Sequence, residues 1–130
     1  MIAVDTNVIV RLLVGDDQKQ AGRARLLFEQ RPIAISATVL LETEWVLRSA
    51  YEFAPHAIFE SFMKLCGLPR VTLIQPGLVR TALEGYRIGL DFADALHLAG
   101  AIPASQFATF DRALVRAAAK LSGAIEVVEP

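Results

Sequence analysis

Short apolar runs alternate with longer helical stretches along the chain, and this alternation restricts the fold more than any other feature of the sequence. The apolar runs are rich in Val and Ile, as strands buried on both faces of a sheet are. We expect strands at residues 2–4, 33–35, 71–74, 107–109 and 125–128. We expect helices at residues 7–14, 17–30, 37–51, 55–68, 77–88, 92–101 and 112–121. Because alternating strands and helices are joined by right-handed crossovers, the pattern predicts a parallel sheet with helices on both faces, a three-layer α/β/α sandwich.

Residues that favour helix ends stand at several of these boundaries. Ser36 can cap the helix at residues 37–51, and Pro55 suits a first helical turn. Gly89 and Gly123 stand where helices should stop. The sequence shows no repeat, linker or low-complexity tract, and 130 residues fit one hydrophobic core. A single domain over residues 1–130 is therefore predicted.

The composition is that of a folded protein with surplus apolar surface. Hydrophobic residues make up 54% of the chain, charged residues make up 21%, and the mean hydropathy is +0.43. Apolar surface beyond the needs of one small core is usually buried against a partner, so we expect a dimer or another binding partner. The formal net charge of −1 neither favours nor excludes nucleic acid. A nucleic-acid enzyme with this balance would have to gather its cations into a patch.

Two features bear on the cellular compartment. Cys66 is the single cysteine, so an intramolecular disulfide is impossible and a reducing compartment is favoured. The apolar run at residues 8–14 contains Arg11 and is far too short to span a bilayer, and we expect no targeting segment. The expected location is therefore cytoplasmic.

Two acids follow predicted strands. Asp5 comes directly after the first strand, and Asp111 lies just beyond the strand at residues 107–109. Ligands of open parallel sheets bind beyond the carboxyl ends of the strands, so both carboxylates are candidates for a functional site. The alternative is that each acid only caps the helix that follows it.

Glu42 is a third candidate. On a helical wheel it falls among Val39 and Trp45, on the side predicted to be buried, whereas Glu44 points the other way and can pair with Arg48 on the surface. A buried carboxylate costs several kcal/mol unless it is paired or bound to a metal. The alternative is that Glu42 reaches solvent at the edge of this face.

Asp94 is the fourth candidate. Asp91 and Asp94 fit an N-cap and an acid in the first helical turn, which is a purely structural arrangement. We accept that interpretation for Asp91. Asp94 shares the apolar side of the predicted helix with Leu98 and Ala101, and capping explains this position less well.

Four carboxylates that converge on one cleft would repel one another. Two charges about 5 Å apart at an effective dielectric of about 20 repel by about 3 kcal/mol, so such a cluster favours a bound divalent cation. An all-oxygen ligand set without cysteine or suitably spaced histidine favours Mg²⁺ or Mn²⁺ over Zn²⁺. A site of this kind generates hydroxide and stabilises the charge of a phosphoryl transition state.

The four acids lie in segments that resemble the motifs of PIN-domain proteins, in particular the VapC-type toxins of toxin–antitoxin pairs. The resembling segments are MIAVDTNVIVRLL at the amino terminus, ISATVLLETEWVLRS around Glu42, GLDFADALHLAGA around Asp94, and ATFDRAL around Asp111. Motif order and spacing agree over essentially the whole chain. DTN alone is a weak signal, whereas DFADALHLA followed by TFD is a strong one.

This resemblance implies a five-stranded parallel sheet, Mg²⁺-dependent RNA cleavage, a homodimer, and inhibition by a small cognate antitoxin. It implies that Asp5 and Asp94 ligate the metal, and that Asp111 and Glu42 complete the shell or orient water. The positions that would hydrogen-bond these carboxylates are Thr6, Asn7 and Thr109. Their alternative roles are helix capping and strand packing.

Other residues have simpler interpretations. Arg112, Arg116 and Lys120 recur every four residues, which fits a solvated helix face or a row of contacts to RNA phosphates. We expect His97 to be a packed residue of an apolar helix without a chemical role. We expect several large apolar side chains to lie in the core or at a dimer surface; these are Trp45, Tyr51, Phe59, Phe62 and Met63.

Three other functions are alternatives for a chain of this kind. A response-regulator receiver needs an acidic pair near the first strand and a lysine after the last, and this chain has neither in place. A phosphatase with an aspartate nucleophile needs a second aspartate where Asn7 stands. A catalytically silent PIN fold that binds another protein is the third alternative, against which the four acids argue.

Overall fold

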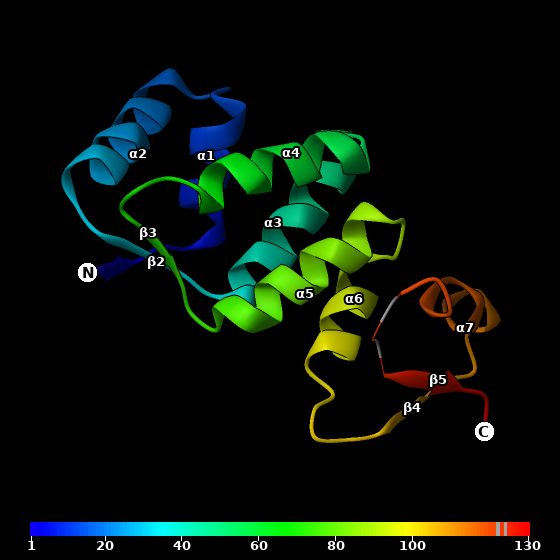
Figure 1. Cartoon of the computed structure of the whole chain (residues 1–130). Helices are drawn as coiled ribbons and strands as arrows, with labels where there is room; N and C mark the ends of the chain where they lie inside the picture. The colour runs from blue at the N-terminus through cyan, green and yellow to red at the C-terminus, as the bar shows by residue number, and fades with distance from the viewer. Residues whose placement is uncertain (122, 124) are drawn as a thin grey trace. The chain divides into compact units, whose positions relative to one another are not determined.

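A computed structural model describes residues 1–121, 123 and 125–130 and divides the chain into two compact units, Met1–Pro76 and Gly77–Pro130 (Figure 1). The elements of the first unit are β1 (Ile2–Ala3), α1 (Thr6–Val14), α2 (Gln18–Gln30), β2 (Ile33–Ile35), α3 (Ala37–Ser49), α4 (Pro55–Cys66) and β3 (Val71–Leu73). Those of the second unit are α5 (Pro76–Arg87), which begins at the boundary, α6 (Phe92–Ala99), β4 (Gln106–Ala108), α7 (Arg112–Ala118) and β5 (Glu126–Val128).

The first unit contains a parallel sheet in the order β1-β2-β3. Ile33 of the central strand pairs with Ile2 on one side and with Val71 on the other. All of β2 is buried, whereas β1 and β3 at the edges are partly exposed, so the expected burial on both faces holds for β2 alone among these three. This register brings the ends of β1 and β2 to one edge of the sheet, from which α1 and α3 start.

Two helices of the first unit start at the capping and proline residues that the sequence indicates. Ser36 Oγ accepts a hydrogen bond from the N–H of Val39 (3.3 Å) and caps α3, and Pro55 begins α4, so both predicted helix starts are confirmed. Ile58 and Phe62 of α4 are fully buried one turn apart, on the apolar face of the helix. Burying each such side chain stabilises the fold by about 1.5–3 kcal/mol. Figure 1 also shows α1 beside α2, and α1 packs against both α2 and α3.

In the second unit, β4 and β5 form a two-stranded parallel sheet with Phe107 opposite Val127. Gly85 of α5 lies so close to α6 that a Cβ atom there would be 3.2 Å from the Cβ of Ala95. Gly89, with a φ of 108°, makes the turn between these helices, as expected of a residue at a helix end.

The α/β class and the parallel pairing are confirmed, and the expected strands are found at their expected places. The described strands form one sheet of three and one sheet of two, so the single five-stranded sheet is not shown. The three-layer arrangement and the single domain stay predictions. Within the described residues, no helix combines the length and the apolar character needed to cross a membrane.

Candidate active site

Two of the four predicted acids line one hollow of the first unit. This hollow has a volume of about 610 Å³, and Asp5 from the end of β1 and Glu42 from α3 both contribute to its wall. The polar side chains that accompany them there belong to Thr6, Asn7, Arg11 and Tyr51. The register of β1 and β2 explains this meeting, because it starts α1 and α3 from the same edge of the sheet.

Asp5 also caps α1. Its Oδ1 accepts a hydrogen bond from the N–H of Thr6 (2.8 Å), so the capping alternative is correct as far as it goes. Oδ2 takes part in no hydrogen bond with any residue that the structure describes, and the side chain is exposed. Capping therefore uses one carboxylate oxygen and leaves the other for a ligand.

Thr6 belongs to the wall of the same hollow, and its hydroxyl is buried. Thr6 is 6% exposed, and its Oγ1 has no hydrogen-bond partner among the described residues. A buried hydroxyl without a partner costs about 1–3 kcal/mol, which a water or ion bound within hydrogen-bond distance would recover. The wall contains carboxylate, amide and hydroxyl oxygens, which a hard cation such as Mg²⁺ prefers, and also the guanidinium of Arg11.

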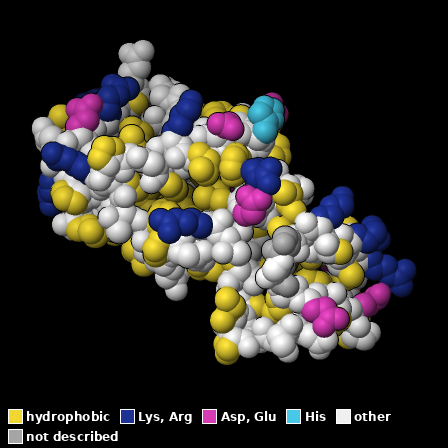
Figure 2. Space-filling view, viewed as in Figure 1, with side chains coloured by type: hydrophobic (Ala, Val, Ile, Leu, Met, Phe, Trp, Pro, Cys, Tyr) yellow, Lys and Arg dark blue, Asp and Glu magenta, His cyan; other side chains and the backbone are white. Residues whose placement is uncertain are grey.

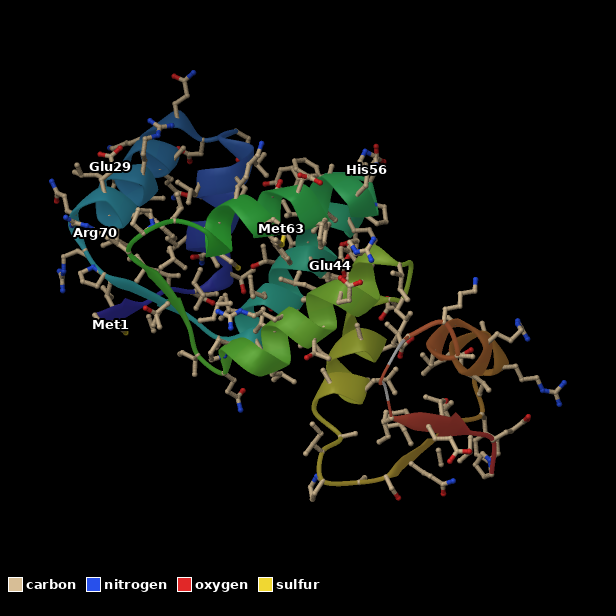
Figure 3. The ribbon with its side chains drawn as sticks, viewed as in Figure 1. Met1, Glu29, Glu44, His56, Met63 and Arg70 are labelled. Carbon is tan, nitrogen blue, oxygen red and sulfur yellow. The ribbon has the colours of Figure 1, made fainter. Side chains whose placement is uncertain are left out.

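The predicted orientations of Glu42 and Glu44 are reversed in the structure. Glu42 is exposed, whereas Glu44, which Figure 3 labels, is 2% exposed. Glu44 accepts a hydrogen bond from Arg48 Nε (2.8 Å). The predicted pairing of Glu44 with Arg48 is thus confirmed, and its predicted surface position is wrong. The buried side of α3 runs through Leu40 and Leu47, and Trp45 is 58% exposed. Since α3 carries apolar residues nearly all round, a helical wheel could not identify this side.

Asp94 and Asp111 interact in the second unit. Asp94 is half-buried, and the pKa of its carboxyl is raised. Burial is the largest cause, and the negative charges of Asp91 and Asp111 raise the pKa further, whereas His97 lowers it. Two acids from separate motifs are therefore close enough to repel each other. Asp91 Oδ1 accepts a hydrogen bond from the N–H of Asp94 (3.3 Å), which confirms Asp91 as the N-cap of α6.

Asp111 caps α7, since its Oδ1 accepts a hydrogen bond from the N–H of Leu114 (3.1 Å). The hydroxyl of Thr109 accepts a hydrogen bond from the main-chain N–H of Asp111 (3.0 Å). Thr109 thus fixes the backbone at this acid, and it makes no hydrogen bond to the carboxylate itself among the described residues. The capping alternative is again correct, and again it uses a single carboxylate oxygen.

Each unit supplies a pair of the predicted acids. Among residues 1–121, 123 and 125–130, no group of three histidine, cysteine, aspartate or glutamate side chains is gathered closely enough to hold a metal ion. The pairs are Asp5 with Glu42 and Asp94 with Asp111. Their oxygen chemistry fits Mg²⁺, while a complete coordination shell is not shown.

A basic stripe lies on α7. Arg112, Arg116 and Lys120 are exposed, and Figure 2 shows Lys and Arg side chains gathered over this helix. Arg112 Nε lies 3.3 Å from Glu129 Oε1. His97 is exposed, so its predicted packing in a core is wrong.

Sequence analysis missed a polar network beside the acids of the first unit. Arg11 Nη1 donates hydrogen bonds to Asp16 Oδ1 (3.3 Å) and to the hydroxyl of Tyr51 (3.2 Å), and Arg11 Nε donates to Gln20 Oε1 (2.7 Å). The hydroxyl of Tyr51 donates to Asp16 Oδ2 (2.9 Å). The sequence predicts Tyr51 in the core or at a dimer surface, and the structure places its hydroxyl in this network. The one signal in the sequence was an arginine inside an otherwise apolar run.

Comparison with known proteins identifies one family. The family model described as PIN domain matches residues 2–120, a range that contains all four candidate acids. Neither the curated proteins nor the solved structures include a match to the chain.

Proposed function

Because the chain belongs to the PIN domain family, we propose that it is a Mg²⁺-dependent endoribonuclease that hydrolyses RNA phosphodiester bonds. PIN domains are in general nucleases, and these nucleases generally use divalent metal ions. The observation that carries the proposal is the family match, which includes every acid that the sequence motifs single out. RNA as the substrate and Mg²⁺ as the ion are the proposed part.

The four acids have distinct proposed roles. Asp5 and Asp94 ligate the metal, and Glu42 and Asp111 complete its shell or orient the attacking water. When bound, the ion supplies an acidified water and neutralises the charge that develops on the phosphoryl oxygens. The hydroxyl of Thr6, which has no hydrogen-bond partner among the described residues, and the exposed carboxylates of Asp5 and Glu42 support this assignment.

Other residues position these groups and the substrate. Thr109 fixes the backbone at Asp111, and Asn7 shares a hollow with Asp5. The basic stripe of α7 is proposed to contact RNA phosphates, in keeping with its exposure.

The proposal includes a biological role as the toxin of a toxin–antitoxin pair, with a small antitoxin as inhibitor and a homodimer as the active assembly. It rests on the resemblance of the motifs and on the high mean hydropathy. Exposed Trp45 and Met63 supply apolar surface for a dimer. Light scattering should report twice the chain mass, and a monomer at micromolar concentration would remove the dimer while leaving the nuclease proposal intact.

The activity is tested with the purified protein and defined single-stranded and structured RNAs. Cleavage is expected with Mg²⁺, none with EDTA, and recovery when Mg²⁺ is added back. Glu60→Gln serves as a control, because Glu60 is an exposed acid of α4 outside the hollow that contains Asp5. RNA that stays intact under every divalent ion, with a folded protein, would contradict the proposal.

A further inference from the structure

The hollow that contains Asp5 and Glu42 adjoins a second hollow of different charge. The second hollow has a volume of about 530 Å³, shares Asn7 and Arg11 with the first, and includes Arg23 of α2. Its wall, as far as the described residues form it, contains no acidic side chain. The surface therefore changes from acidic at Asp5 and Glu42 to basic at Arg11 and Arg23, within one unit of the chain.

Arg11 stands at the junction of the two hollows, and its guanidinium is fixed. Nε and Nη1 donate to Gln20, Asp16 and Tyr51, whereas Nη2 takes part in no hydrogen bond with any residue that the structure describes. Arginine carries five N–H donors in a planar fork that matches phosphate oxygens. Because the neighbours already restrict the side chain, a phosphate that binds the remaining donors loses little side-chain entropy.

We propose that Arg11 and Arg23 bind phosphates of the RNA strand beside the scissile bond, so that the two hollows form one track for the RNA backbone. The proposal rests on the ribonuclease function proposed above and adds where the strand continues after it leaves the acids. Arg11 follows Asp5 by six positions, a rise of about 9 Å along α1. Arg11 thus lies beside the acids, where it can contact a neighbouring phosphate.

The two hollows differ in charge, and this difference determines which of them can hold an RNA strand. Asp5 and Glu42 repel a polyanion unless a cation is bound between them and the phosphate, so they cannot retain the strand by themselves. Arg11 and Arg23 attract it at any metal concentration. Asp16 opposes this attraction, because its carboxylate lies 3.3 Å from Arg11. Arg23 has no such neighbour, since it forms no ion pair or hydrogen bond with a described residue.

A purely structural role for Arg11 makes a different prediction. In that case Arg11 only ties the end of α1 to the segment that begins α2 and to Tyr51. Its loss would lower the melting temperature, and Arg23 would not matter for RNA at all. Arg23 therefore decides between the two roles, and it also keeps the proposal testable if an Arg11 variant fails to fold.

The chain offers a matched control on the same helix. Arg25 is exposed on α2, as Arg23 is, but it lines neither hollow. Arg23→Gln and Arg25→Gln remove the same charge from positions two residues apart. A difference between these two variants cannot arise from net charge or from helix propensity.

The experiment compares wild type with Arg11→Gln, Arg11→Lys, Arg23→Gln and Arg25→Gln on a fluorescein-labelled single-stranded RNA with Mg²⁺ across a salt series. Arg11→Gln and Arg23→Gln should each raise KM about tenfold with kcat nearly unchanged. Each should lower the slope of log(kcat/KM) against log(salt) by about 0.7, the loss of one phosphate contact on a single strand. Arg11→Lys should keep the slope and raise KM less, and Arg25→Gln should match wild type. Fluorescence anisotropy of the same RNA with Ca²⁺ replacing Mg²⁺ gives a readout of binding alone.

The failures can be told apart. A wild type that neither binds nor cleaves RNA would remove the proposed function and this track together. A wild type that cleaves RNA, with Arg23→Gln indistinguishable from Arg25→Gln in KM and salt slope, would overturn the track alone. A lower melting temperature of Arg11→Gln with unchanged KM would likewise assign Arg11 to a structural role.

Discussion

Carboxylates at helix starts have two possible uses in this chain. Asp5 and Asp111 each give one oxygen to a helix cap, and the other oxygen stays available. Asp94 differs, because it accepts no cap hydrogen bond among the described residues and its pKa is raised, first by burial and then by Asp91 and Asp111. Helix capping therefore explains part of the role of Asp5 and Asp111, and it does not explain Asp94.

Asp94→Asn should abolish metal binding and lower RNA cleavage by at least about a hundredfold, since even groups that only support a metal ligand are worth 10–100-fold. The variant should fold normally, because asparagine keeps the size of the side chain. Isothermal titration and a cleavage time course measure the two effects. A folded variant that cleaves RNA at the wild-type rate would refute the assignment of Asp94.

The stability of the same variant should depend on pH when no metal is present. The raised pKa of Asp94 means that folding disfavours its ionised form. Wild type is therefore less stable than Asp94→Asn above that raised pKa. The difference should shrink as the pH falls through it and vanish below the ordinary aspartate range, where Asp94 is neutral in both states. Urea unfolding at neutral and acidic pH measures this, and equal stability at neutral pH would contradict it.

The buried carboxylate of Glu44 should make Arg48 important for stability. Arg48→Ala removes an ion-pair partner of an acid that is 2% exposed, and we expect a loss of about 1–3 kcal/mol in the free energy of unfolding. Arg87→Ala is the control, because the Glu84–Arg87 pair is exposed and solvent screens it. Chemical denaturation compares the two variants. Similar small changes in both would mean that Glu44 does not depend on Arg48.

The sequence predicted where helices start more accurately than where they end. Ser36, Pro55, Asp91 and Asp111 announce the starts of α3, α4, α6 and α7, because capping side chains and proline act locally. Helix α7 ends at Ala118, whereas the apolar pattern continues to residue 121 and predicted a longer helix. An apolar pattern indicates which face of a helix is buried, but it does not indicate at which residue the helix ends.

The candidate site was predictable in its chemistry and less so in its surroundings. The motifs identified acids that the structure pairs within each unit, Asp5 with Glu42 and Asp94 with Asp111. The sequence could not reveal the network of Arg11 and Tyr51, which lie 40 residues apart. Such contacts depend on how helices pack, and local patterns do not encode this.

Substitutions of Asp111 can separate its role as the cap of α7 from its proposed role in catalysis. Asp111→Asn should leave the stability of α7 within a few tenths of a kcal/mol, because asparagine caps as well as aspartate, whereas Asp111→Ala should cost about 1 kcal/mol. Both variants should lose RNA cleavage. Asp17→Asn is the control, since Asp17 caps α2 in the same way outside the four acids. Cleavage by Asp111→Asn at the wild-type rate would leave Asp111 with a capping role alone.

The whole chain should respond to a divalent ion as a single ligand-binding protein. An ion that binds the folded state stabilises it by about 2.7 kcal/mol when its free concentration is about 100 times its Kd. For a chain of this size, that corresponds to a rise in Tm on the order of 10 °C.

The prediction is that Mg²⁺ raises Tm in wild type and in Glu60→Gln, and that Asp5→Asn and Asp94→Asn each abolish the rise. Asp5 belongs to the first unit and Asp94 to the second, so the two variants change one acid of each pair. Differential scanning calorimetry across a Mg²⁺ titration, with Ca²⁺ and EDTA for comparison, gives the measurement. A rise that survives in both variants would place the ion elsewhere on the protein. The absence of any rise in wild type would remove the metal from the proposed function, and the two acid pairs would then need another explanation.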